Sequence, residues 1–261
     1  MKLYIINMKD SLRRRKAIEG QLKTLMVKYE FVESIDARKY TQDEINSLTA
    51  TPDSFTGGQV GCMLSHCKVY ERMQKENDKY AIILEDDSFI IEKLFVKLCE
   101  QVIQFQDELD ELSITLLTYS WCRDGILRLH KEKDIILEER EYLLCNPEET
   151  WGIGRSGAYI ISKYMAQQLY DFNSPKVRCH ADAWVVYVNN KILNRIYCLY
   201  PMPIIENVEF GSEIVYTKNK VEKAAKMLVE KIIVYNIPIL AKLVKERRRR
   251  FSENRKKILL N

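Results

Sequence analysis

The chain has 261 residues, of which 46% are hydrophobic and 30% are charged, and its formal net charge at pH 7 is +4. A chain of this length and composition can bury a large core, which excludes a disordered, collagen-like or disulfide-dense protein. Its seven cysteines are scattered, odd in number and without a C-x-x-C pair, so we expect reduced core thiols rather than a zinc ribbon or a disulfide framework.

The first half of the chain alternates between short apolar runs and longer stretches with helical periodicity. The pattern predicts strands at 3–6, 31–35, 81–84 and 114–117, and helices at 13–27, 60–77 and 92–105. The polar stretch 49–59, which contains Pro and Gly, is predicted to be a loop. The apolar run at the N-terminus is too short for a signal peptide, so we expect a cytoplasmic protein.

The second half is less regular. Residues 120–150 have a mixed pattern that predicts no element, and beyond them we predict strands at 157–161 and 192–200 and helices at 163–170 and 181–188. Alternating strands and helices indicate an α/β class with a Rossmann-type, mostly parallel sheet flanked by helices. Ligands of such sheets bind beyond the carboxyl ends of the strands.

Residues 218–261 carry the positive charge of the chain. They hold 14 Lys and Arg against 4 Asp and Glu, a net +10, which leaves −6 for residues 1–217. We therefore predict a body (1–217) and a basic tail (218–261) of two amphipathic helices separated at Pro238. The longest apolar stretch of the tail is too short to cross a bilayer. A basic tail indicates an anionic membrane surface or a nucleic acid, and its few aromatic residues favour the membrane.

Three acids, Glu85, Asp86 and Asp87, directly follow the strand predicted at 81–84. Adjacent carboxylates repel one another, so a bound cation would stabilise them. Because side chains of a strand alternate, we expect Glu85 and Asp87 on one face and Asp86 on the other. Two carboxylates on one face predict a site for Mg²⁺ or Mn²⁺. Phosphates of the substrate would complete the coordination of the ion. The alternative is an acidic cap on the next helix.

Other polar residues are candidates, each with a structural alternative. Asp182 stands near Trp184, and an aromatic neighbour can raise the pKa of a carboxyl toward that of a general base, but Asp182 can also belong to a helix start. Arg13 and Arg14 follow a strand end, where guanidinium groups can bind a diphosphate, or they lie on a solvated helix face.

Ser65 and His66 lie on the helix predicted at 60–77, where a lone histidine is more often a core residue. The segment GCMLSH that contains them (61–66), followed by ILEDD (83–87), resembles glycosyltransferase family 25, the lipooligosaccharide sugar transferases. The resemblance covers roughly residues 2–210 and extends to YIIN (4–7), Arg13, Arg14, GAYIIS (157–162), Asp182 and Trp184.

The resemblance implies a GT-A-like fold, a UDP-sugar donor such as UDP-galactose, and inverting transfer to a lipid-linked oligosaccharide of lipopolysaccharide or lipooligosaccharide. The acids would then replace the D-x-D signature, with Glu85 in the first place, which leaves open which pair binds the metal. We expect Asp87, with Glu85 or Asp86, to hold Mn²⁺ or Mg²⁺ against the donor diphosphate. Asp182 is the expected general base that takes the proton of the acceptor hydroxyl.

Asn7, Arg13 and Arg14 are expected at the nucleotide end of the crevice, and Ser65 and His66 beneath the sugar. The tail would hold the protein on the inner face of the cytoplasmic membrane, where a lipid-linked acceptor lies. Two other functions remain open: a nucleic-acid-binding or scaffolding protein that uses the basic tail, and a metal-dependent phosphotransferase or hydrolase.

Overall fold

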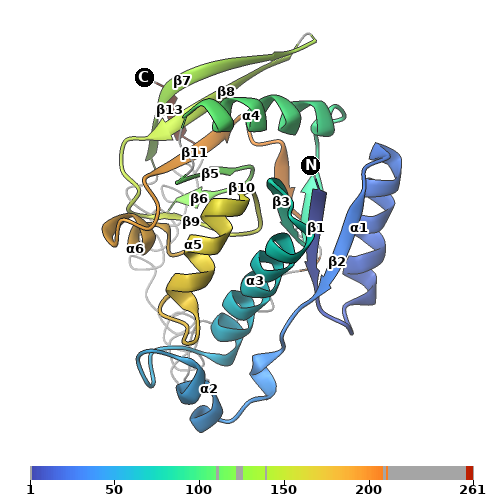
Figure 1. Ribbon diagram of the computed structural model, residues 1–261. Coiled ribbons are helices and arrows are strands. Elements are labelled where there is room, and N and C mark those ends of the chain that lie inside the picture. Colours follow the sequence, from blue (N-terminus) through green and yellow to red (C-terminus); the bar gives the residue numbers. More distant parts are fainter. Residues whose placement is uncertain are drawn as a thin grey trace, which may run out of the picture.

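A nine-stranded sheet forms the centre of the computed structural model, which describes residues 2–109, 112–121, 126–138, 140–207, 210 and 257–260 (Figure 1). Its strands are β1 (Lys2–Asn7), β2 (Tyr29–Glu33), β3 (Tyr80–Glu85), β5 (Ser113–Leu116), β7 (Ile126–Leu137), β8 (Arg140–Pro147), β10 (Ala158–Ser162), β11 (Arg195–Tyr200) and β13 (Lys257–Leu260). They lie in the order β13-β7-β8-β11-β5-β10-β3-β1-β2. Two small sheets pair β4 (Ser88–Ile90) with β12 (Ile204–Glu206), and β6 (Ser120–Trp121) with β9 (Ile153–Gly154).

Most strands of the central sheet run in one direction. β1 pairs in parallel with β2 and β3, β5 with β11, and β7 with β13, whereas β8 and β10 each run against both neighbours. The other strands described in this sheet therefore share one direction, which confirms the predicted α/β class with a mostly parallel sheet. The carboxyl ends of β1, β2 and β3 meet at one end of the sheet, where ligands of such folds bind.

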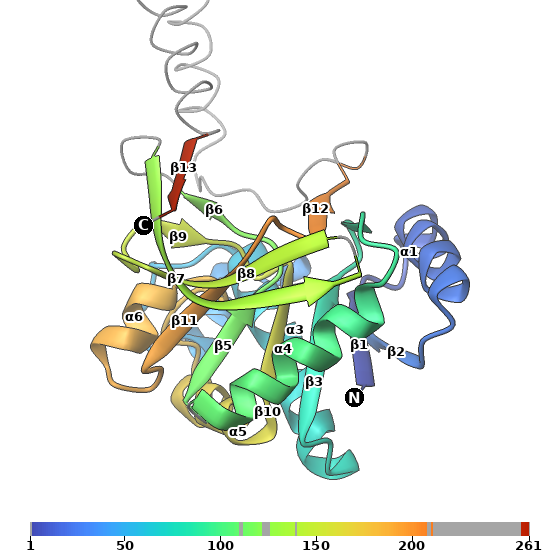
Figure 2. The same cartoon turned by 90° about the horizontal axis from the view of Figure 1, so that it is seen from above.

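Helices cover both faces of the sheet, as the views in Figures 1 and 2 show. They are α1 (Leu12–Leu25), α2 (Gln42–Leu48), α3 (Gly57–Glu76), α4 (Phe95–Leu109), α5 (Lys163–Asn173) and α6 (Trp184–Asn189), with the short 3-10 helix η1 (Ala37–Lys39). Side chains of β3 alternate between two apolar clusters. Ala81 and Ile83 pack with α3 and α5, while Ile82 and Leu84 pack with α1 and α4. Full burial of one Ile or Leu side chain contributes about 1.5–3 kcal/mol, so packing on both faces stabilises this strand.

The helix predicted from residue 60 begins earlier, at Gly57. Thr56 and Gln59 form a capping box that starts it there. A Cβ at Gly61 would lie 2.4 Å from the carbonyl oxygen of Ile35, so only glycine allows α3 to approach the segment after β2 this closely. The approach brings the first turns of α3 beside the end of β3.

Residues 120–150, for which no element was predicted, form β6 and the antiparallel hairpin β7–β8. Leu127 and Leu129 pack into the cluster of α3, whereas Ile135 and Leu137, at positions of the same parity, pack into the cluster of α4. A register shift between Lys131 and Lys133 exchanges the two faces of the strand. This irregularity, together with a run of charged residues, conceals the strand from a search for strict alternation.

Of the predicted basic tail, the structure describes only residues 257–260. They form β13, which pairs in parallel with β7, and are not part of a helix. The two predicted tail helices and the boundary at 217 lie outside the described residues. In the part of the chain that the structure describes, no helix has the length and apolar character needed to cross a membrane.

Candidate functional site

The three acids lie where β3 ends, beside the end of β1. Strand alternation continues into the first two, so Glu85 points toward α3 and Asp86 toward α1, on opposite faces as predicted. The next helix, α4, begins only at Phe95. The alternative in which the acids cap that helix is therefore wrong.

Asp86 is buried and bound to two of the residues predicted at the nucleotide end. Its carboxylate accepts hydrogen bonds from Asn7 Nδ2 at 2.7 Å and from Arg14 Nη1 at 2.9 Å. Burial raises the pKa of Asp86, and the bonds from Arg14 and Asn7 offset part of that rise. Asp86 thus fixes the Arg14 guanidinium, which also lies 3.5 Å from Asp87 Oδ2.

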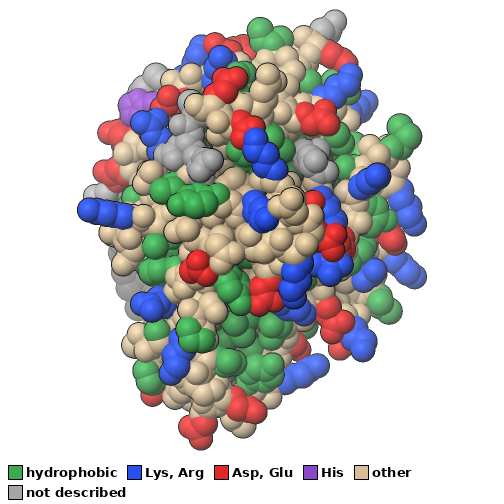
Figure 3. All heavy atoms as spheres, in the orientation of Figure 1, with side chains coloured by type: hydrophobic (Ala, Val, Ile, Leu, Met, Phe, Trp, Pro, Cys, Tyr) green, Lys and Arg blue, Asp and Glu red, His purple; other side chains and the backbone are tan. Residues whose placement is uncertain are grey.

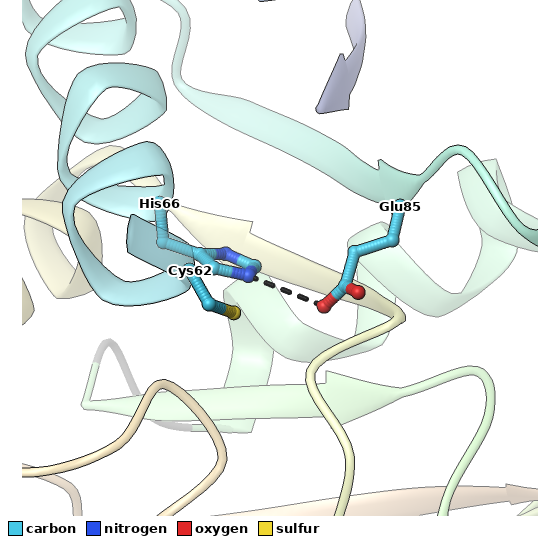
Figure 4. Close-up of side chains that lie close together, drawn as sticks. All are labelled: Cys62, His66 and Glu85. Carbon is cyan, nitrogen blue, oxygen red and sulfur yellow. Dashed lines mark ion pairs between the residues drawn. The ribbon is translucent and has the colours of Figure 1, made fainter. Parts of the chain in front are cut away.

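Glu85 faces a buried histidine on α3 (Figure 4). Its Oε1 lies 3.5 Å from His66 Nε2 and accepts a hydrogen bond of 2.9 Å from Ser156 Oγ. On the other side of the ring, His66 Nδ1 lies 2.8 Å from the hydroxyl of Tyr159, which lies 2.8 Å from that of Tyr70. Burial acts to raise the pKa of Glu85, but the contacts with His66 and Ser156 outweigh it, so the pKa is lowered and Glu85 stays ionised.

The surroundings of Asp87 oppose the ionisation of its carboxyl group. Burial, and then the charge of Glu85, raise the pKa of Asp87 to about 7, although Arg14 acts against the rise. Only 19% of the Asp87 side chain is exposed. A divalent cation beside Asp87 and Glu85 would stabilise both ionised carboxylates, and carboxylate oxygens are the donors that Mn²⁺ and Mg²⁺ prefer.

Two adjoining cavities meet at Glu85 and Asp87. The first is lined by residues from the ends of β1 and β2, from α1 and from the start of α3, including Met8, Arg14, Asp36, Arg38, Gly58 and His66. The second has a volume of about 370 Å³ and is lined by Arg155, Ser156, His180, Asp182 and Glu206, among others. Cys62, Glu85 and Asp87 line both cavities, so the acids stand at their junction.

Asp182 lies in the second cavity together with Glu85 and Asp87. It does not cap the helix that follows, because Ala183 is the N-cap of α6 and the cap makes no side-chain hydrogen bond. Instead Asp182 Oδ2 accepts a hydrogen bond of 3.1 Å from the backbone N–H of Arg155. Arg155 has a φ of 82°, a conformation that L-residues rarely adopt and that often marks functional sites.

Three predicted residues, Asn7, Ser65 and Arg13, do not line either cavity among the described residues. Asn7 instead donates a side-chain hydrogen bond to Asp86. Ser65 Oγ donates to the carbonyl oxygen of Gly61 at 2.6 Å and accepts from the backbone N–H of Ile35 at 2.8 Å, so it joins α3 to the segment after β2. The Arg13 guanidinium lies 5.6 Å from the ring centre of Phe210. Arg13 belongs to a basic edge along α1, where Lys and Arg side chains gather (Figure 3).

Several residues of the site were not predicted from the sequence. Cys62 stands one helical turn before His66, a spacing that places both on one face of α3 and that was available in the sequence. Ser156, Arg155 and Glu206 come from distant segments, and no local pattern marks them. Arg155 and Glu206 form an ion pair beside Asp182.

Comparison of the sequence with protein families identifies one family. The sequence model of glycosyltransferase family 25 (LPS biosynthesis protein) matches residues 1–185. A glycosyltransferase 25 family member of Aedes aegypti is 26% identical over 179 residues, which are 65% of this chain and 28% of the relative. Procollagen galactosyltransferase 1-A of Xenopus laevis is 25% identical over 95 residues, 33% of this chain and 16% of the relative. The chain thus spans less than a third of the length of these relatives.

Solved structures with a similar course of the chain include a glycosyltransferase involved in the glycosylation of the major capsid of PBCV-1. It is 11% identical, with 76% of this chain and 79% of that chain covered and a TM-score of 0.36. An apo UDP-glucose pyrophosphorylase is 9% identical, with 76% and 72% covered and a TM-score of 0.37.

Proposed function

The chain belongs to glycosyltransferase family 25, and from this premise we propose that it transfers a hexose from a UDP-sugar to an oligosaccharide acceptor. The observation that carries the proposal is that the carboxylates of Glu85, Asp87 and Asp182 are among the groups that line a single cavity. Such a cavity offers cation-binding and proton-accepting groups to one substrate. Galactose or a related hexose is the proposed sugar, in keeping with the galactosyltransferase named among the relatives.

In the proposed site Glu85 and Asp87 would hold Mn²⁺ or Mg²⁺ against the diphosphate of the donor. The bound ion would neutralise the charge that develops on the departing nucleotide. Arg14 adds a fixed positive charge on the side of the first cavity, where it is oriented by Asp86, which Asn7 holds in turn. We therefore place the nucleotide in the first cavity and the sugar at the junction of the two.

Asp182 is the proposed general base. Asp182 lines the second cavity and does not cap a helix. Its Oδ2 accepts a hydrogen bond from the backbone N–H of Arg155. A carboxylate there takes the proton of the acceptor hydroxyl as the hydroxyl oxygen attacks the anomeric carbon and the bond to the diphosphate breaks. Attack from the face opposite the leaving group inverts the anomeric configuration.

We propose a lipid-linked oligosaccharide of lipopolysaccharide or lipooligosaccharide as the acceptor, which agrees with the description of the family as LPS biosynthesis proteins. The basic segment 218–261 would hold the protein on the anionic inner face of the cytoplasmic membrane, because clustered Lys and Arg are attracted to anionic lipids. These residues are proposed to act by charge and not by spanning the bilayer.

Thermal unfolding of the full chain tests the donor and the metal together. UDP with Mn²⁺ should raise the melting temperature more than either alone, since only the complex joins the diphosphate to the carboxylates. A rise with oligonucleotides and none with UDP and Mn²⁺ would support the nucleic-acid-binding alternative instead. Hydrolysis of UDP-sugar at an equal rate with and without acceptor would support a hydrolase.

Asp182→Asn tests the general base. The variant should keep donor binding and lose about 10²- to 10⁴-fold in turnover, the range that general base catalysis contributes. Asp171→Asn is the matched control, because Asp171 is an exposed acid on α5 outside both cavities. Weak donor binding with unchanged turnover at saturation would contradict the assignment.

A further inference from the structure

A cysteine, a histidine and a glutamate converge at the junction of the two cavities (Figure 4). Cys62 and His66 project from successive turns of α3, and Glu85 projects toward them from the end of β3. One ligand atom of each, the Cys62 Sγ, a His66 ring nitrogen and a Glu85 carboxylate oxygen, lies within 4.8 Å of the other two. Cys62 is a free thiol, and the three residues come from α3 and β3, which both pack into the core.

The unsatisfied nitrogen of His66 is the second observation that points to a ligand. The His66 side chain is fully buried, and its Nε2 has no hydrogen-bond partner among the described residues. A buried polar atom without a partner destabilises a fold by about 1–3 kcal/mol, so such an atom calls for an explanation. Here the atom is aimed at Glu85 Oε1, at a distance of 3.5 Å.

That distance fits two ligands of one metal ion. Nitrogen and oxygen atoms that each lie about 2.1 Å from a tetrahedral zinc are about 3.4 Å apart. The donor set selects the kind of ion, because a cysteine sulfur and an imidazole favour Zn²⁺ and similar ions over Mg²⁺ and Mn²⁺. Three protein ligands leave one position open, and Cys62 and Glu85 border both cavities from which an ion or water would enter.

The surroundings of the three residues are those of a metal site. A metal-binding histidine donates its other ring N–H to a fixed partner, and His66 Nδ1 lies 2.8 Å from the Tyr159 hydroxyl. In the metal-bound form the His66 proton would lie on Nδ1, and the lone pair of Nε2 would bind the ion in place of its direct contact with Glu85. Glu85 in turn is held by the hydrogen bond from Ser156 Oγ. The contacts with Tyr159 and Ser156 therefore orient the His66 and Glu85 side chains in the metal-free protein.

We propose that Cys62, His66 and Glu85 form a binding site for Zn²⁺ or a similar thiophilic divalent cation. On binding, the Cys62 thiol releases its proton to solvent and coordinates as the thiolate. The site is distinct from the proposed Mn²⁺ or Mg²⁺ site but shares Glu85 with it. Occupancy by Zn²⁺ therefore removes one carboxylate from the donor-binding ion.

Titration of the full-length, reduced protein with Co²⁺ tests the proposal, because cobalt bound to a thiolate absorbs in the near ultraviolet. One equivalent of Co²⁺ should produce this band, and Zn²⁺ should abolish it. Cys62→Ala should lose the band, whereas the matched control Cys67→Ala, on the same helix but outside both cavities, should keep it. Tyr159→Phe should keep the band and weaken Co²⁺ binding about 10- to 100-fold, because it frees the His66 ring.

A saturable band that survives Cys62→Ala, or no band in the native protein at any Co²⁺ concentration, would overturn the proposal. In that case the His66 and Glu85 side chains form an ion pair and nothing more. Circular dichroism and the melting temperature of each variant show whether it is folded. No nucleotide sugar and no Mn²⁺ enter the titration, so its failure leaves the proposed transfer reaction standing.

Discussion

Asp87→Asn should stabilise the metal-free protein at neutral pH, although it removes a proposed metal ligand. Burial and the neighbouring charge of Glu85 raise the pKa of Asp87 from 3.8 to about 7. In the unfolded chain this carboxyl ionises near its ordinary pKa, so a rising pH favours the unfolded state until the folded protein also loses the proton. Asn has the shape of the neutral acid and never ionises, so the variant escapes this loss.

The shift sets the size and the pH dependence of the effect. About three pKa units correspond to about 4 kcal/mol of folding free energy, since one unit is worth about 1.4 kcal/mol. The variant should gain less than about 1 kcal/mol near pH 4 and about 4 kcal/mol near pH 8, with the increase falling between the two pKa values. The side chain is only 19% exposed, so solvent screens the effect little.

Urea unfolding of the native chain and of Asp87→Asn, with a chelator present and at several pH values, measures the difference. Asp171→Asn, at an exposed acid, should show no comparable gain at any pH. Addition of Mn²⁺ should then stabilise the native chain and not Asp87→Asn. A loss of stability near pH 8, or a gain of equal size at pH 4 and pH 8, would refute the reasoning about Asp87.

Three further predictions concern backbone packing, a buried acid and the basic tail. Gly20→Ala should stabilise the protein by about 0.5–1 kcal/mol, because a Cβ at Gly20 meets nothing within 4 Å. Gly61→Ala should destabilise the protein by about 1–3 kcal/mol. Thermal unfolding measures both variants, and equal effects would contradict the close approach of α3. Glu92 is buried, bonds Tyr142 and has a lowered pKa, because its hydrogen bonds outweigh burial. Glu92→Gln should therefore lose about 1.5–3 kcal/mol at neutral pH, and urea unfolding should show this difference shrinking as the pH falls below about 4. Replacement of arginines 247–250 by Gln should weaken the salt-sensitive binding to anionic vesicles by about 4 kcal/mol in a sedimentation assay, and unchanged binding would exclude the charged tail as the anchor.

The position of the acids was predictable because it depends on local pattern. An apolar run followed by Glu85, Asp86 and Asp87 indicates a buried strand and its end. Strand alternation predicts that Glu85 and Asp86 point to opposite faces of the sheet. The same holds for the helices α1, α3 and α5, whose apolar residues recur at the helical period. The family resemblance also rested on such local segments, and the match over residues 1–185 confirms it.

The strands β7 and β8 show where local pattern fails. A register shift in β7 moves positions of one parity from one apolar cluster to the other, so neither face of the strand has a continuous apolar pattern in the sequence. Tertiary pairing, and not the intrinsic alternation of residues, decides this part of the sheet.

The sequence by itself determined the strand that ends in the acids, the class of the fold and the family of the chain. The tertiary structure alone decided that Glu85 meets His66 and Cys62, that Asp86 meets Asn7 and Arg14, and that Asp182 shares a cavity with the acids. The physical reason is the range of the forces involved. Periodic burial acts within one helix or strand. The contacts between these side chains depend instead on how β1, β3 and α3 pack against one another, which requires residues far apart in the sequence to come together.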